Sequence, residues 1–134
     1  MRAFFFLCNS ETERECLDRK LMGTNFKQEK AKWLSSICPG TIIFLYNYYN
    51  DTIWGPMVAA TQVKEWVPDA WEGKFKAQVK VDFGNDFKKI SLEQHSLVIE
   101  KLKGIYPNPL IDPLTLKKLF AIFGLPDQGH EPTD

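Results

Sequence analysis

An alternation of apolar and polar residues between positions 74 and 81 is the feature that most limits the fold of this chain. The apolar set is Phe75, Ala77, Val79 and Val81, and the residues interleaved with it are Lys74, Lys76, Gln78 and Lys80. Alternation with a period of two predicts a β-strand with one buried face and one wet, basic face. The fold must therefore contain a sheet that turns one side of this strand to solvent.

Further strands are predicted from other apolar runs. Residues 3–8 form a dense run rich in phenylalanine, and residues 41–48 are strongly β-prone. Asn50-Asp51 predicts a hairpin turn into a strand over residues 53–61, in which Gly55-Pro56 indicates a bulge or an edge. A turn at Asn85 and a last short strand over Phe87–Ile90 complete the sheet.

Four helices are predicted around these strands, over residues 11–21, 28–37, 92–102 and 112–123. Asn9 or Ser10 caps the first helix, whose first turn is acidic, and Gly23 ends it. Asp112 caps the last helix, with Pro113 at its first position. This order predicts one α+β domain over residues 1–124, with about five to six strands curled into a small barrel flanked by helices. Residues 125–134 are predicted to be a flexible tail.

Composition narrows the classes of function. Seventeen basic residues balance seventeen acidic ones, so net charge does not indicate a partner. The three cysteines have no CxxC spacing, which favours reduced thiols in a cytoplasmic protein, or a nuclear one if the source is eukaryotic. No run approaches the roughly 20 apolar residues of a membrane span. We find no pattern of a nucleophile, a metal site or a phosphate-binding glycine loop, so neither enzyme activity nor a cofactor is expected.

Two tryptophans five residues apart, Trp66 and Trp71, lie in a segment that is predicted to be a loop, because Pro68 and Asp69 between them disfavour both helix and strand. Lysines flank the pair, and aromatic rings among cations can stack a nucleobase while holding the adjoining phosphates. Tryptophan is also mostly buried in proteins, so a role in the core or as a lid stays open. A ligand role predicts the ring of Trp66 partly exposed beside a pocket, and a scaffold role predicts it buried without a cavity.

These residues carry a resemblance to known families. The strand ending in Cys8-Asn9-Ser10, the segment Pro39–Tyr46, and Trp71 followed by Phe75–Val79 resemble the development and cell death (DCD) domain. The spacing Trp66-x4-Trp71-x-Gly73-x-Phe75 resembles the YTH readers of N6-methyladenosine. Both families belong, with EVE domains, to the PUA-like superfamily, and similar modules read methylated bases in McrBC-type restriction systems.

The YTH resemblance implies a reader that flips a modified base, most simply N6-methyladenine, into an aromatic cage. Trp66 and Trp71 would be walls of that cage, and the position where the family usually has a third tryptophan falls at Met22, or at Leu21 if the alignment shifts by one residue. Asn9 and Ser10 would contact the base edge, although both also suit a helix N-cap. Phosphate contacts would come from basic residues that otherwise read as solvated surface: Lys64, Lys74, Lys76, Arg14, Arg19 and Lys20.

The expected partner is thus a nucleic acid carrying a modified base, single-stranded or with the base flipped, RNA being favoured over DNA. A membrane partner is not expected, whereas a protein partner or a larger assembly is possible. The DCD resemblance implies an alternative, a protein-interaction scaffold without nucleic-acid activity.

Overall fold

The computed structural model describes residues 2–25, 32–105 and 108–126. Its strands are β1 (Ala3–Cys8), β2 (Leu21–Thr24), β3 (Ile42–Asn47), β4 (Thr52–Ala59), β5 (Ala77–Ser91) and β6 (Leu110–Ile111). Its helices are α1 (Ser10–Arg19), α3 (Ser96–Ile105) and α4 (Pro113–Ile122), with a 3-10 turn, η1, at Ala70–Gly73.

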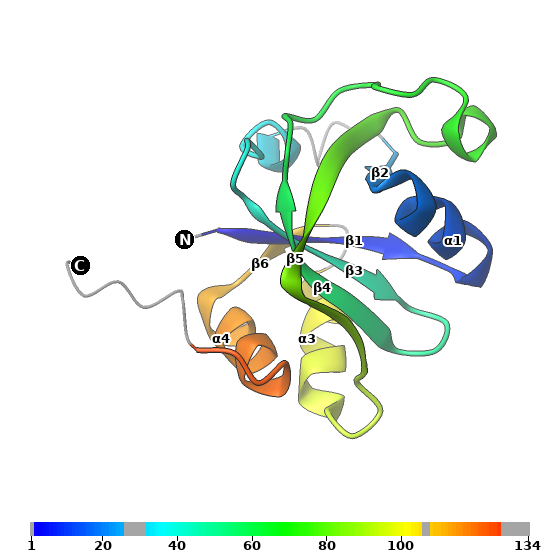
Figure 1. Cartoon of the computed structure of the whole chain (residues 1–134). Coiled ribbons are helices and arrows are strands. Elements are labelled where there is room, and N and C mark those ends of the chain that lie inside the picture. The colour runs from blue at the N-terminus through cyan, green and yellow to red at the C-terminus, as the bar shows by residue number, and fades with distance from the viewer. Residues whose placement is uncertain (1, 26–31, 106–107, 127–134) are drawn as a thin grey trace.

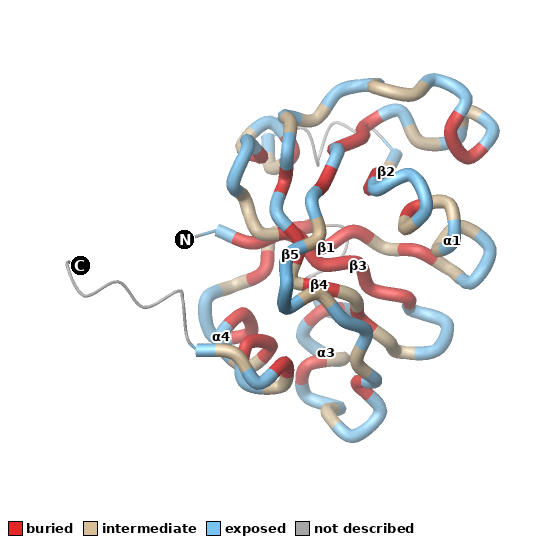
Figure 2. Tube along the Cα trace, viewed as in Figure 1, coloured by how far each residue is buried: buried red, intermediate tan, exposed pale blue. Residues whose placement is uncertain are grey.

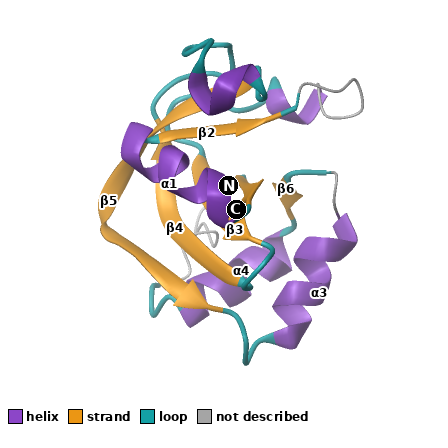
Figure 3. Cartoon of the chain, turned by 90° about the vertical axis from the view of Figure 1, so that its right-hand side faces the viewer, coloured by secondary structure: helices purple, strands orange, loops and turns teal. Residues whose placement is uncertain are grey.

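The described strands form one sheet in the order β2-β5-β4-β3-β1-β6. The sheet is strongly curved, so that β5 arches from the lower part of the molecule to β2 (Figures 1 and 3). Neighbours pair antiparallel, except for the parallel pair β1 and β3. This curled sheet of six strands with flanking helices confirms the predicted α+β fold, in which the small barrel that was expected takes the form of a half-barrel.

Two hydrophobic cores lie on the two faces of the sheet, and β1 contributes to both. Phe4 and Phe6 point into the core that α1 and β2 cover, whereas Ala3 and Phe5 point into the core under α3 and α4. The buried residues accordingly cluster along the central strands (Figure 2). A strand buried on both faces explains why residues 3–8 are almost continuously apolar.

Several local predictions are confirmed. The side chain of Asn9 caps α1 and accepts hydrogen bonds from the backbone of Glu11 and Thr12, both at 2.9 Å. Asp112 caps α4, with Pro113 in its first turn. The β3–β4 hairpin turns at the predicted place, and the pairing of β4 with β5 shifts register between Gly55 and Met57.

Other local predictions are wrong for reasons that involve distant contacts. Gly23 does not end a helix, because residues 21–24 pair with β5 as strand β2. Asn85 is not a turn between two strands, since β5 continues through it to Ser91 and takes up the extra residues as an irregularity opposite β4. Gln78 was expected on the wet face of its strand but is fully buried.

Parts of two further predictions lie outside the described residues. Of the predicted helix over 28–37, positions 32–34 are helical and 28–31 are not described. Of the predicted tail, residues 127–134 likewise lie outside the described ranges. No helix in the described part of the chain is long and apolar enough to cross a membrane.

Candidate functional site

Trp66 has a half-buried ring with two lysine side chains close to it. The ammonium of Lys64 lies 4.9 Å from the ring centroid and that of Lys80 lies 5.3 Å from it. The indole N–H donates to the backbone carbonyl of Gln62 at 3.0 Å, which fixes the orientation of the ring. Because both lysines are exposed, the result is an oriented aromatic surface with two solvent-accessible cations close to it.

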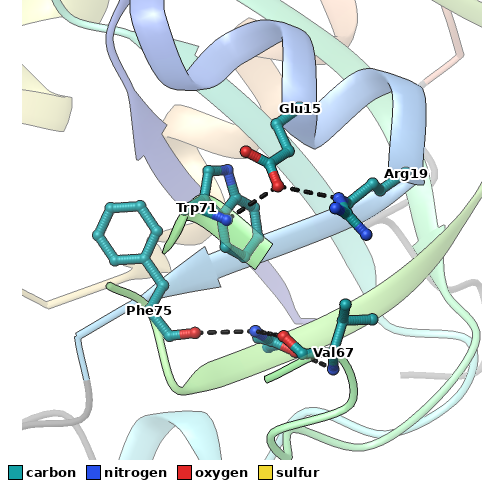
Figure 4. Close-up of polar contacts among 6 residues, drawn as sticks. Glu15, Arg19, Val67, Trp71 and Phe75 are labelled. Atoms are coloured by element: carbon teal, nitrogen blue, oxygen red, sulfur yellow. Dashed lines mark hydrogen bonds and ion pairs between the residues drawn. The ribbon is translucent and has the colours of Figure 1, made fainter. Parts of the chain in front are cut away.

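The loop that carries Trp66 is held in place by Gln78 of β5. Its amide oxygen accepts from the backbone N–H of Val67 at 2.7 Å, and its amide nitrogen donates to the carbonyls of Val67 and Phe75 at 2.9 and 2.8 Å (Figure 4). Lys64 and Gln78 also exchange two backbone hydrogen bonds, of 2.8 and 3.0 Å. A buried amide with its bonding capacity used in this way makes the loop rigid.

Trp71 is buried, with 4% of its surface exposed. Its ring packs edge-on against Phe75, with 5.2 Å between the centroids, and lies directly over Gly23, where any side chain would collide with it. Its backbone N–H donates to the carboxylate of Glu15 at 2.8 Å, and the same carboxylate binds Arg19 at 2.9 Å (Figure 4).

The backbone conformation and the burial of Trp71 both cost free energy. Trp71 and Glu72 both adopt positive φ angles, of 49° and 56°, which residues with side chains rarely do. The indole nitrogen is buried without a hydrogen-bond partner among the described residues. The thiol of Cys16 lies near this ring. Burial raises the pKa of that thiol to about 12, and the Trp71 side chain lowers it by a smaller amount.

Met22 is completely buried in the same core as Trp71, and Trp66 packs against that core from its partly exposed side. The structure thus brings the three predicted cage residues around one core, with only Trp66 accessible. Met22 and Trp71 are both buried, so a base could reach either of them only if the packing around them changed. The cage remains a prediction.

The predicted phosphate-binding residues fall into two groups. Lys76, Arg14 and Arg19 are ion-paired with carboxylates. Lys64 lies over Trp66, Lys20 lies 5.4 Å from the ring centroid of Phe83, and Lys74 is exposed. Sequence reasoning missed Lys80, although its place on the wet face of the alternating strand was the signal that could have found it.

A cavity of about 560 Å³ lies at the end of β1. All residues of Phe5–Asn9 line it, together with Gly23, Thr24, Phe75 and Tyr46. Asn9 thus contributes to a cavity as well as to the N-cap, whereas Ser10 is the exposed first residue of α1. Neither Trp66, Trp71 nor Met22 lines this cavity.

Comparison with solved structures identifies the class of fold as that of YTH domains. The Mmi1 YTH domain has a TM-score of 0.67 at 9% identity, over 92% of this chain and 88% of that one. The YTH domain of Zygosaccharomyces rouxii MRB1, solved in complex with N6-methyladenosine RNA, has a TM-score of 0.65 at 15% identity, over 99% and 91%. At these identities the likeness concerns the fold.

Within that class, the chain belongs to the development and cell death domain family, whose model matches residues 2–108. It is 36% identical over 86 residues to the DCD domain-containing protein NRP-A of Glycine max, covering 58% of this chain and 23% of that protein. It is 35% identical over 89 residues to the B2 protein of Daucus carota, covering 58% of this chain and 41% of that protein. The matched region is thus less than half the length of either relative.

Proposed function

We propose that this domain binds single-stranded nucleic acid, RNA in the first place, with Trp66 as the stacking surface. The observation that carries the proposal is the half-buried ring of Trp66 with the ammonium groups of Lys64 and Lys80 at 4.9 and 5.3 Å from its centroid. The fold adds support, because it is shared with a YTH domain solved with methylated RNA.

In the proposed complex, a base stacks on the accessible part of Trp66. Such stacking contributes about 1–3 kcal/mol per base. The two lysines leave the ring and contact the phosphates on either side, which makes binding dependent on salt. The hydrogen bonds that Gln62 accepts from the indole N–H and Gln78 accepts from the backbone of Val67 hold the ring and its loop beforehand, so little ordering is required when the strand binds.

A finer form of the proposal makes the domain a reader of N6-methyladenine. The base would then be flipped into a cage of Trp66, Trp71 and Met22, with Asn9 and Ser10 at its edge. Because Met22 and Trp71 are buried, this form requires the strained Trp71 segment to open. It predicts that methylated strands bind more tightly than unmethylated ones and that they displace the ring of Trp71.

The experiment is a fluorescence anisotropy titration of labelled single-stranded RNA and DNA, with and without one N6-methyladenine, at a fixed salt concentration. Trp66→Ala should weaken binding by about tenfold or more, since one stacked base is lost. Lys64→Gln with Lys80→Gln should weaken binding and reduce its salt dependence. The matched control is Lys101→Gln with Lys118→Gln, which changes the charge equally on α3 and α4.

A protein-interaction domain of DCD type is the second candidate, favoured by the burial of Trp71 and Met22, which gives both residues a role in the fold. This candidate predicts that the unaltered protein binds none of the four oligonucleotides. Binding that Trp66→Ala leaves unchanged would also contradict the stacking proposal.

A further inference from the structure

Three half-buried aromatic rings form a column on strands β4 and β5. The rings of Phe83 and Phe87 are stacked, with 4.0 Å between their centroids and an interplanar angle of 2°. The ring of Trp54 also stacks on Phe87, at 5.5 Å and 20°. Two stacked rings cannot share one face of Phe87, so Phe83 and Trp54 cover its opposite faces. The order of the aromatic column is therefore Phe83, Phe87, Trp54.

An irregularity in the pairing of β4 with β5 builds this column. Pro56 of β4 stands opposite residues 84–87 of β5, where a regular ladder would have a single residue. Residues four apart on a regular strand are about 13 Å apart, yet the rings of Phe83 and Phe87 are in contact. Bulges re-aim side chains and are over-represented next to functional sites. Here the bulge brings together two rings that a regular strand would separate.

Hydrogen bonding fixes Trp54 at one end of the column. Its indole N–H donates to the carboxylate of Glu13, on α1, at 2.9 Å. The same carboxylate accepts from the side-chain amide of Asn47, which is fully buried, at 3.3 Å. The ring is thus oriented before any partner binds, and an oriented aromatic surface loses little freedom when it enters an interface.

A lysine side chain lies over each terminal ring of the column. The ammonium of Lys20 lies 5.4 Å from the ring centroid of Phe83. Lys89 stands opposite Trp54 in the ladder, and its ammonium lies 5.5 Å from the centroid of that ring. Among the described residues, no carboxylate forms an ion pair with either lysine. Each end of the column therefore carries a positive charge that is not neutralised by an ion pair of this kind.

The exposed part of the central ring is its edge, because both faces of Phe87 are covered. An aromatic edge carries partial positive charge and attracts carboxylates and the faces of other rings. A nucleobase instead stacks on a ring face. The column is therefore better suited to acidic and aromatic side chains than to a nucleic-acid strand.

We propose that the aromatic column and its two lysines bind an acidic segment of a protein partner. An aromatic or aliphatic side chain of the partner packs on the ring edges, and carboxylates on either side of it bind Lys20 and Lys89 through charge-assisted hydrogen bonds. This inference goes beyond the proposed function and does not depend on it. Lys20, to which the YTH resemblance assigns a phosphate contact, binds a carboxylate in this complex.

The first test selects ligands from a phage-displayed library of linear twelve-residue peptides on the immobilised protein, after removal of peptides that also bind the Lys89→Glu variant. Retained peptides should carry acidic residues on both sides of an aromatic or large aliphatic residue. Phe87→Leu keeps an apolar side chain but removes the stacking ring, so it should weaken these peptides about tenfold. Lys88→Glu makes the same charge change at the exposed neighbouring residue and should weaken them less than about threefold. If no peptide is retained, or if the retained peptides lack acidic residues, the proposal is overturned.

The second test locates the bound peptide and separates its site from that of the nucleic acid. In 15N-labelled protein, a retained peptide should shift the indole N–H resonance of Trp54 and leave that of Trp66 in place. Phe87→Leu should change the affinity for single-stranded RNA less than about twofold, and Trp66→Ala should leave the peptide affinity unchanged, so the two proposals can fail independently.

Two outcomes would assign the column to another occupant and overturn the proposal. The first is a loss of RNA affinity in Phe87→Leu as large as that in Trp66→Ala, which would place the column in the nucleic-acid interface. The second is a dimer of the unaltered protein that Phe87→Leu dissociates in sedimentation velocity, because a second copy of the chain would then occupy the column.

Discussion

Replacing Gly23 with alanine tests how Trp71 is packed. A Cβ atom at position 23 would lie 2.6 and 2.7 Å from two carbons of the Trp71 ring and 3.1 Å from the Cβ of Phe75. Carbon atoms prefer about 3.5–4.0 Å, so the ring must move by about 1 Å within a filled core. Overpacking of this kind costs about 1–3 kcal/mol. Replacing a glycine with alanine also lowers the conformational entropy of the unfolded chain, which offsets about 0.4–1 kcal/mol of that loss.

The net expectation is a loss of about 1–2 kcal/mol in the free energy of unfolding, measured by urea denaturation, and a fall in Tm of about 4–10 °C. Gly104→Ala is the matched control: no atom lies within 4 Å of the added Cβ, and the residue belongs to α3, so this variant should be as stable as the parent or more so.

A double-mutant cycle assigns the loss to the contact with the ring. Trp71→Ala should itself cost about 3–5 kcal/mol. In that background Gly23→Ala should cost almost nothing, because the atoms with which its Cβ collides are gone. A Gly23→Ala protein as stable as the parent, or additive effects of the two changes, would refute the described position of the Trp71 ring.

Three further predictions concern the buried groups and the caps. Gln78→Leu should lower the free energy of unfolding by at least about 2 kcal/mol in urea denaturation, because it leaves three backbone groups of Val67 and Phe75 unpaired; an unchanged midpoint would contradict the role of the amide. Because burial raises the pKa of Cys16 to about 12, unfolding releases its proton above about pH 9, and stability should fall from there towards pH 12, less steeply in Cys16→Ala. Asp112→Ala should cost about 1 kcal/mol, since Thr115 loses its capping carboxylate, and an equal Tm would show that the cap contributes nothing.

The parts of the fold that depend on local chemistry were predictable from the sequence. The cap at Asn9 and the hairpin after β3 follow from residues within a few positions of one another. Gly23 illustrates the opposite case, because a glycine shortly after a predicted helix resembles a C-cap. The actual role of Gly23 comes from its pairing with β5 as part of β2 and from the Trp71 ring that packs against it.

The candidate site shows the same division. That Lys64 lies near Trp66 followed from the composition of the loop, whereas the sequence left open whether the ring of Trp66 is exposed or buried. The burial of Trp71 did not, because it depends on Gly23 and on a hydrogen bond to Glu15, 56 residues away in the chain. The cavity at the end of β1 could not be predicted either, because its lining combines Phe5–Asn9 with residues as distant in the chain as Phe75 and Asn108.

The most direct test of the central claim, that Trp66 stacks a base, is the intrinsic fluorescence of this ring during titration with unlabelled single-stranded RNA. A Trp33→Phe, Trp54→Phe background leaves only Trp66 and the buried Trp71 to report. Stacking predicts saturable quenching that Trp66→Phe abolishes, and whose midpoint agrees with the anisotropy titration. Anisotropy-detected binding without quenching would contradict the claim, because the strand would then be held by charge elsewhere on the surface.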